Sequence, residues 1–227
     1  MINEKIQKRI NFLNNSKDLK IIFDIKYGNR TFPKKNKFIK FENINGGYTS
    51  INSNEIFIVR HEEYPKVILH EIIHHNPLIH SDKWKKKNII KLKKHFNIDT
   101  KTDLEPNEAI VEFWATIMHL YFISIENNID IKKLLKDEIK YSLFKSNQLL
   151  NHLDSKWYEE SNAYCYIIFK TIMLYNLKEF LKIYDFPYDD TKITDFLIKH
   201  SKLPIIKKNP FNKIPDESLR MMIYSDL

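Results

Sequence analysis

Two histidines and a glutamate fall within five consecutive residues of an apolar stretch, in the order His70-Glu71-x-x-His74. Residues four apart share one face of an α-helix, so both imidazoles could reach the same metal ion. Glu71 lies about 100° further round such a helix and could reach a water molecule beside the ion. The pattern predicts a zinc site with Glu71 as general base. The alternative is a buried helix whose histidines are only hydrogen-bonded.

A catalytic zinc site needs a third protein ligand and keeps its fourth position for water. Downstream, Pro106 suits the first turn of a helix, and Glu108 and Glu112 follow it on one helical face. A ligand imidazole usually donates its other N–H to a carboxylate or carbonyl, so one glutamate could bind the metal and the other could orient a histidine. Spacing leaves open which glutamate has which role, and Glu112 could also be a surface carboxylate.

A helical His-Glu-x-x-His followed by Asn107-Glu108-Ala109-Ile110 and a further acidic residue resembles the gluzincins, the thermolysin-like zinc peptidases. The resemblance covers two short helical segments. It implies that Glu108 is the third zinc ligand, that Glu112 orients a ligand histidine, and that the reaction is peptide hydrolysis. The Gly-x-Met-x-Asn stretch of related aminopeptidases is absent, which leaves the substrate class open.

Members of that family also use a histidine far downstream as a transition-state donor, and no local motif identifies it here. Three residues are the candidates for such a donor: His152, Tyr164 and Tyr166. The two tyrosines could equally be core aromatics, and His152 could be a packing residue.

Composition indicates one mainly helical α+β domain, because the chain has 227 residues, 43% of them hydrophobic, and only 3 glycines. Cys165 is the only cysteine, so we expect a reducing, intracellular environment. The N-terminus resembles no secretory signal. The longest apolar run, residues 113–125, is shorter than the ~20 residues that span a bilayer, so we expect a soluble cytoplasmic protein without membrane contact.

The net charge of +8 could indicate a nucleic-acid partner, and residues 83–94 hold the densest run of lysines. Apolar residues recur among these lysines at helical spacing, so we interpret the run as an amphipathic helix with a solvated basic face and expect no nucleic acid. The abundance of Ile, Lys and Asn is typical of AT-rich genomes. In this the chain is similar to metallopeptidases encoded by large DNA viruses, which would place it in host cytoplasm or virion.

Periodicity predicts a small N-terminal sheet and a helical remainder. Gly46-Gly47 indicates a turn or a close backbone approach. In zincins a sheet edge beside the metal helix binds the peptide substrate, and residues 55–60 or 37–44 are the candidates for that strand. Strands are expected at 19–27, 37–44 and 55–60, and helices at 2–14, 64–76, 81–96, 106–126, 130–153, 160–183, 192–200 and briefly from Asp216.

We therefore expect a zincin-like domain with an N-terminal helix and a mixed or antiparallel sheet (1–62), metal-binding helices (63–126) and a helical C-terminal part (127–227). One Zn²⁺ per chain would serve hydrolysis of a peptide or protein substrate. Two alternatives remain open. The chain could be a zinc amidohydrolase or de-modifying enzyme acting on one protein partner, or a basic nucleic-acid-binding or interaction protein with an inactive zincin core.

Overall fold

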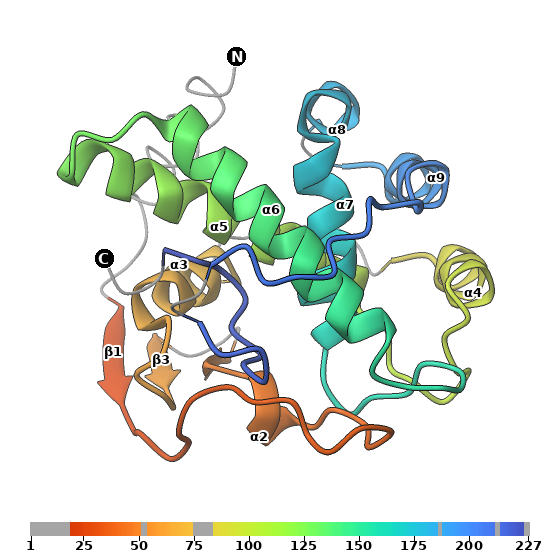
Figure 1. Cartoon of the computed structure of the whole chain (residues 1–227), viewed down its shortest axis with the longest axis horizontal. Coiled ribbons are helices and arrows are strands. Elements are labelled where there is room, and N and C mark those ends of the chain that lie inside the picture. Colours follow the sequence, from red (N-terminus) through yellow and green to blue (C-terminus); the bar gives the residue numbers. More distant parts are fainter. Residues whose placement is uncertain (1–18, 51–53, 75–83, 186–187, 212–213, 225–227) are drawn as a thin grey trace.

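The computed structural model describes residues 19–50, 54–74, 84–185, 188–211 and 214–224. These residues form a mixed α+β fold in which helices predominate and a three-stranded sheet lies at one side. Figure 1 shows α3 lying over the sheet, with the long helices α5 and α6 beyond it and α4, α7, α8 and α9 on the opposite side of the molecule. The expected α+β class is therefore confirmed.

The sheet has the order β1-β3-β2 and is mixed. The central strand β3 (Glu55–Ile58) pairs in parallel with β1 (Lys20–Phe23) and antiparallel with β2 (Gly47–Thr49). Alternate residues of β3, Ile56 and Ile58, are buried and form a small core with Val67 of α3. The strands expected in residues 19–27 and 55–60 are confirmed, with shorter bounds.

The strand expected in residues 37–44 is wrong, because this segment closes a helical turn instead. The Asn43 side chain accepts a hydrogen bond from the Lys40 amide at 3.0 Å, and the Asn43 amide donates to the Lys40 carbonyl at 3.0 Å. Such local bonds compete with strand pairing. The segment contributes the short helix α2 (Phe41–Ile44). The strand that pairs antiparallel with β3 is β2, which begins at Gly47.

The helices mostly begin where proline and aspartate signals predict. Pro106 opens α5, and the Asp130 carboxylate caps α6 by accepting from the Lys132 amide. The expected helix at 160–183 is interrupted at Asn176 and begins with a π-helical turn, η1. The helix bounds are α3 Tyr64–His74, α4 Lys86–His95, α5 Pro106–Glu126, α6 Ile131–Leu150, η1 Cys165–Phe169, α7 Lys170–Tyr175, α8 Leu177–Ile183 and α9 Asp190–Lys199.

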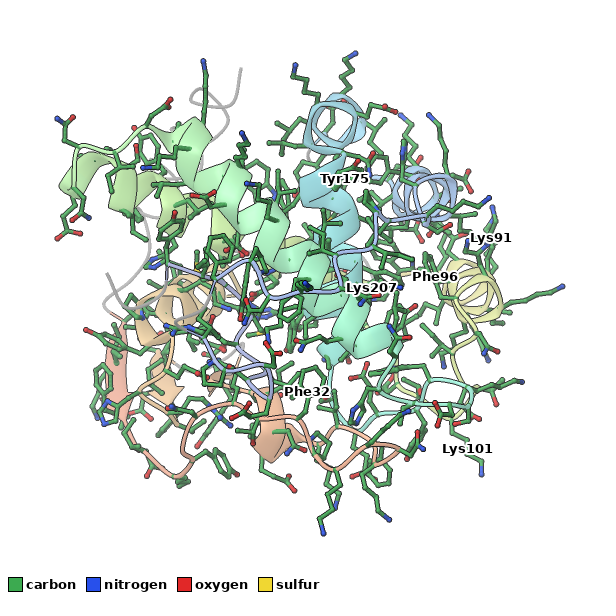
Figure 2. All side chains as sticks on the ribbon, in the orientation of Figure 1. Phe32, Lys91, Phe96, Lys101, Tyr175 and Lys207 are labelled. Carbon is green, nitrogen blue, oxygen red and sulfur yellow. The ribbon has the colours of Figure 1, made fainter. Side chains whose placement is uncertain are left out.

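Three expectations fall outside the described residues: the helix at 2–14, the end of the metal helix at residues 76–77, and Ser81 as a helix cap. Within the described part of the chain, α4 is an amphipathic helix as expected, with Leu92 buried and its lysines largely exposed. Figure 2 shows α4 at the periphery, where Lys91 is labelled and long side chains extend outward. Lys91 pairs with Asp195 of α9 at 2.5 Å.

The helix α5 forms the centre of the fold, since all of its residues from Ala109 to Leu120 are buried. One hydrophobic core extends from Ile39 to Met221 and includes this helix and η1, α7, α8 and α9. Among the described helices, α5 is long and apolar enough by mean hydropathy to cross a membrane. The longest apolar run within it, residues 113–125, is shorter than the helix. Of its most apolar window, 72% is buried inside the structure, as in the core helix of a globular fold.

The helix expected from Asp216 is wrong, and an irregular segment, residues 216–224, takes its place. Buried side chains of Glu63, which directly precedes α3, and of Lys170 in α7 form hydrogen bonds with its backbone. The amides of Met221 and Met222 donate to the Glu63 carboxylate at 3.0 and 2.7 Å, and the Met221 carbonyl accepts from Lys170 at 2.5 Å. An α-helix would need those same amides for itself, so these contacts favour an extended path.

The Glu159 carboxylate caps the helix that begins at η1. It accepts hydrogen bonds from the amides of Ala163 and Tyr164 at 2.7 and 3.0 Å and from the Ser161 hydroxyl at 2.8 Å. Burial raises the pKa of Glu159 to about 7 despite these bonds.

The raised pKa of Glu159 predicts that the folded state binds a proton more tightly than the unfolded state. The stability that the protonated Glu159 side chain contributes is present below about pH 4.5 and is lost as pH rises through 7. We expect the difference in unfolding free energy between wild type and Glu159→Gln to fall by on the order of 2–3 kcal/mol between pH 4.5 and 8. Urea unfolding at several pH values measures this difference, and a pH-independent difference would contradict the assignment.

Candidate metal centre

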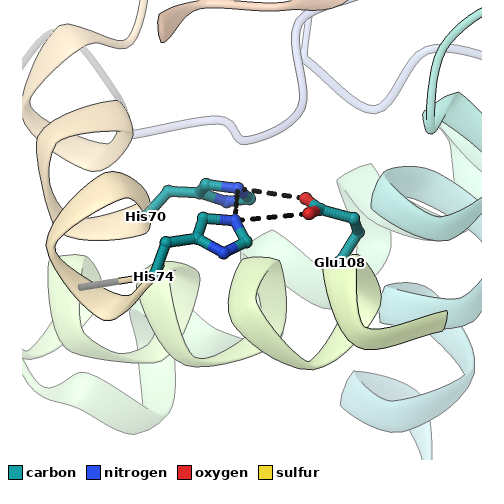
Figure 3. A group of neighbouring side chains, drawn as sticks. All are labelled: His70, His74 and Glu108. Atoms are coloured by element: carbon teal, nitrogen blue, oxygen red, sulfur yellow. Dashed lines mark hydrogen bonds and ion pairs between the residues drawn. The ribbon is translucent and has the colours of Figure 1, made fainter. Parts of the chain in front are cut away.

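His70, His74 and Glu108 meet between α3 and α5 (Figure 3). The Nε2 atoms of the two histidines are 3.1 Å apart. The Glu108 carboxylate faces both, with Oε2 at 3.3 Å from Nε2 of His70 and Oε1 at 3.3 Å from Nε2 of His74. The three side chains are 9%, 18% and 13% exposed, so the group is largely shielded while His74 is the most accessible.

The separations match those required around one small cation. Donor atoms at the usual zinc distances in a tetrahedral site lie roughly 3.3 Å from one another. Two neutral imidazoles that meet Nε2 to Nε2 can share only one hydrogen bond, and a cation satisfies both lone pairs. Among the described residues, the buried Oε2 of Glu108 has no hydrogen-bond partner of good geometry. The donor set could therefore hold a metal ion.

The electrostatics of the group also favour a cation. Burial would lower the pKa of His70, but the adjacent carboxylates of Glu108 and Glu112 outweigh it and raise that pKa to about 10. Burial likewise opposes ionisation of Glu108, yet the neighbouring histidines hold its pKa well below the ordinary value. A pocket that holds a proton so firmly attracts positive charge, and a divalent metal competes for the same position.

Glu112 lies one helical turn beyond Glu108 and contacts the far side of the His70 ring. Its Oε2 is 2.9 Å from Nδ1 of His70, so the ring presents Nε2 to the metal position when Nδ1 carries the proton. Its Oε1 accepts a hydrogen bond from the Lys66 ammonium at 2.6 Å. The structure thus places the two glutamates at different distances from the donor group, with Glu108 inside it and Glu112 behind it.

Glu71 lies beside the donor group and lines the cleft that opens onto it. Burial raises the pKa of its carboxyl group above the ordinary value, which makes it a stronger proton acceptor. Gly47 makes room for it. A Cβ atom at Gly47 would lie 2.8 Å from the carbonyl oxygen of Phe57 and 3.4 Å from Oε1 of Glu71. The close backbone approach expected at Gly46-Gly47 is therefore confirmed, because β2 packs against both β3 and the metal helix.

A cleft of about 680 Å³ reaches the donor group from outside, with His70, His74 and Glu108 in its wall. The residues of β2 line the same cleft, and β2 is an edge of the sheet as described. The two segments expected to hold a substrate strand are both unsuitable. Strand β3 is paired on both sides, and residues 41–44 are helical. The sheet edge beside the metal helix is β2.

Of the three candidates for a transition-state donor, one lies at the cleft and two do not. Tyr166, in η1, lines the cleft, and its ring meets that of His70 edge to face at 5.6 Å. Burial, then the charges of Glu108 and Glu71, raises the pKa of Tyr166, so its hydroxyl remains a hydrogen-bond donor. Tyr164 is a buried core aromatic that contacts Trp157, and His152 pairs with the Lys37 carbonyl at 2.7 Å. Neither is brought to the donor group.

Sequence reasoning missed Lys66 and β2 as parts of the site. A signal for Lys66 was present, since it is four residues before His70 and eight before His74, on one face of the same helix. A buried lysine on the face that carries two ligands needs an acidic partner, and Glu112 is available one turn after Glu108. Strand β2 has only three residues and two glycines nearby, which leaves little pattern to detect.

Comparison of the chain with protein-family models, curated proteins and solved structures found no significant match. Function is therefore inferred from the geometry of the donor group and the cleft.

The positions of the two glutamates predict unequal losses of zinc affinity. Glu108→Ala removes a donor atom from the group, so affinity should collapse. Glu112→Ala leaves the donors in place but frees the His70 ring, which should cost roughly 10–100-fold. Competitive titration against a chromophoric chelator measures both. Glu138→Ala, which removes a buried carboxylate elsewhere, is the control; a larger loss in Glu112→Ala than in Glu108→Ala would reverse the assignment.

Proposed function

We propose that this protein is a zinc-dependent metallopeptidase of the gluzincin type. One observation carries the proposal: His70 and His74 of α3 converge with Glu108 of α5, 34 residues after His74, at spacings suited to one tetrahedral ion. Glu71 supplies the carboxylate that such a centre needs beside it. The zincin-like identity of the fold is part of this proposal and is supported by α3 packed on a sheet whose outer strand among the described residues, β2, lines the cleft.

Zinc held by these three side chains would supply a Lewis acid that lowers the pKa of water and polarises a carbonyl oxygen. Glu71, buried at the cleft wall with a raised pKa, accepts a proton from the attacking water and donates it to the leaving nitrogen. The Tyr166 hydroxyl, protonated throughout, donates a hydrogen bond to the oxygen on which negative charge develops. Glu112 keeps the His70 ring in orientation through Nδ1.

The cleft has the form that a peptide substrate requires. An extended peptide can pair with the outer edge of β2 through main-chain hydrogen bonds, whatever its side chains. Such pairing would place a scissile bond beside Glu71, which contacts the region of Gly47. A peptide or protein substrate is therefore the class that this arrangement supports best.

Glu71→Gln separates metal binding from chemistry. Glutamine has nearly the same shape but cannot accept the proton, so zinc content should be unchanged while turnover falls by at least roughly 100-fold. Elemental analysis and a profile of cleaved peptides provide the two readouts. Glu126→Gln, an exposed carboxylate at the far end of α5, is the matched control. Wild-type turnover in Glu71→Gln would exclude Glu71 as the general base.

Tyr166→Phe tests the hydroxyl at the cleft wall. The substitution keeps the ring against His70 and removes only the donor, so we expect kcat to fall by roughly 10–1,000-fold with little change in zinc affinity. Tyr164→Phe is a matched control, because Tyr164 lies two residues earlier in the same helix and does not line the cleft. Equal activity of the two variants would remove Tyr166 from the mechanism.

A further inference from the structure

Lys66 is a fully buried lysine in the first half of α3, with 0% of its side chain exposed. An ammonium group is costly to bury unless it is paired, and its partner here is the equally buried Glu112 at 2.6 Å. The pair joins α3 to α5 behind the metal centre. Lys66 lies one helical turn before His70, so the pair also lies close to a residue of the donor group.

The carboxylate of Glu112 has two oxygens, and each has a different partner. Oε1 accepts from the Lys66 ammonium and Oε2 faces Nδ1 of His70 at 2.9 Å. A carboxylate can rotate about its terminal torsion, which has broad preferences. A donor fixed on Oε1 removes that freedom. Because Lys66 and His70 lie on the same face of α3, the carboxylate is held between two groups whose spacing the helix sets.

We propose that Lys66 is a positioning residue of the metal centre: through Glu112 it holds the His70 ring with Nε2 directed at Glu108 and His74. This role rests on the proposed zinc site, because orientation of the ring matters only if Nε2 binds a metal. Lys66 acts in this role through hydrogen-bond geometry, with no change in the charge of any group.

A simpler electrostatic role for Lys66 predicts the opposite sign. Its ammonium is a positive charge in the interior near the metal position, so its repulsion alone would weaken the binding of any cation. If Lys66 acted only through that charge, removing it would tighten zinc binding. If Lys66 holds Glu112 in place, removing it loosens the His70 ring and weakens zinc binding. The direction of the change therefore distinguishes positioning from repulsion.

The test compares Lys66→Met with wild type and with Lys145→Met. Lys145 is also buried but binds the Ser218 carbonyl and the Gln148 side chain, away from the donor group. Competitive zinc titration should give a roughly 10–100-fold weaker affinity for Lys66→Met and the wild-type value for Lys145→Met. Cobalt substitution adds a second readout, because visible absorption follows ligand geometry. The spectrum should change in Lys66→Met alone.

Zinc affinity of Lys66→Met that equals or exceeds that of wild type would overturn the positioning role, as would an unchanged cobalt spectrum. If Lys66→Met does not fold, Lys66→Gln replaces it with the same expected losses. Failure of the wild-type chain itself to take up zinc would overturn the proposed function and, with it, the role of Lys66. Zinc binding by wild type with equal affinity in the Lys66 variant would overturn the role of Lys66 alone.

Discussion

The burial of carboxylates between α3 and α5 is the constraint on which the rest of the structure depends. A buried carboxylate is tolerated only with a cationic or hydrogen-bonding partner. Glu63 has Arg30 at 2.8 Å and Glu112 has Lys66 at 2.6 Å. Glu108 differs, since the groups facing it are two imidazoles, which are neutral unless protonated. The carboxylates behind the donor group therefore have permanent cations as partners, whereas Glu108 needs either protonated imidazoles or a metal ion.

The same constraint accounts for the irregular C-terminal segment, residues 216–224. Glu63 binds its amides on one side, and Glu138 accepts from the Ile223 amide at 2.9 Å on another. Lys170 is 3.5 Å from Glu138 and donates to the Met221 carbonyl. Backbone groups thus add hydrogen bonds to buried charges that are already paired with cations. The segment covers the rear of the α3–α5 pair, and its path is set by those side chains rather than by helical propensity.

Residue spacing and helix-starting residues predicted those elements whose formation depends on neighbouring residues in the sequence. The four-residue spacing of His70 and His74 and the proline at 106 were sufficient for α3 and α5, whereas the choice of Glu108 over Glu112 came from the resemblance to a known motif. Contacts that depend on register between distant elements were not predictable. The pairing of Lys66 with Glu112 joins residues 46 apart, and the choice of Tyr166 over Tyr164 depends on how η1 turns. The segment from Asp216 has helical composition, but tertiary hydrogen bonds override it.

The donor group is buried at one end and partly exposed at the other, and a ligand can reach it from the exposed end. Along α3, Lys66 is fully buried, His70 is 9% exposed and His74 is 18% exposed, so access is from the His74 side. The described residues that line the cleft there include the carboxylates of Asp103 and Glu105 and no lysine or arginine. The net charge of +8 is therefore located elsewhere, in part on α4. A basic composition says little about this cleft, whose local field is negative and suits a cation at its base.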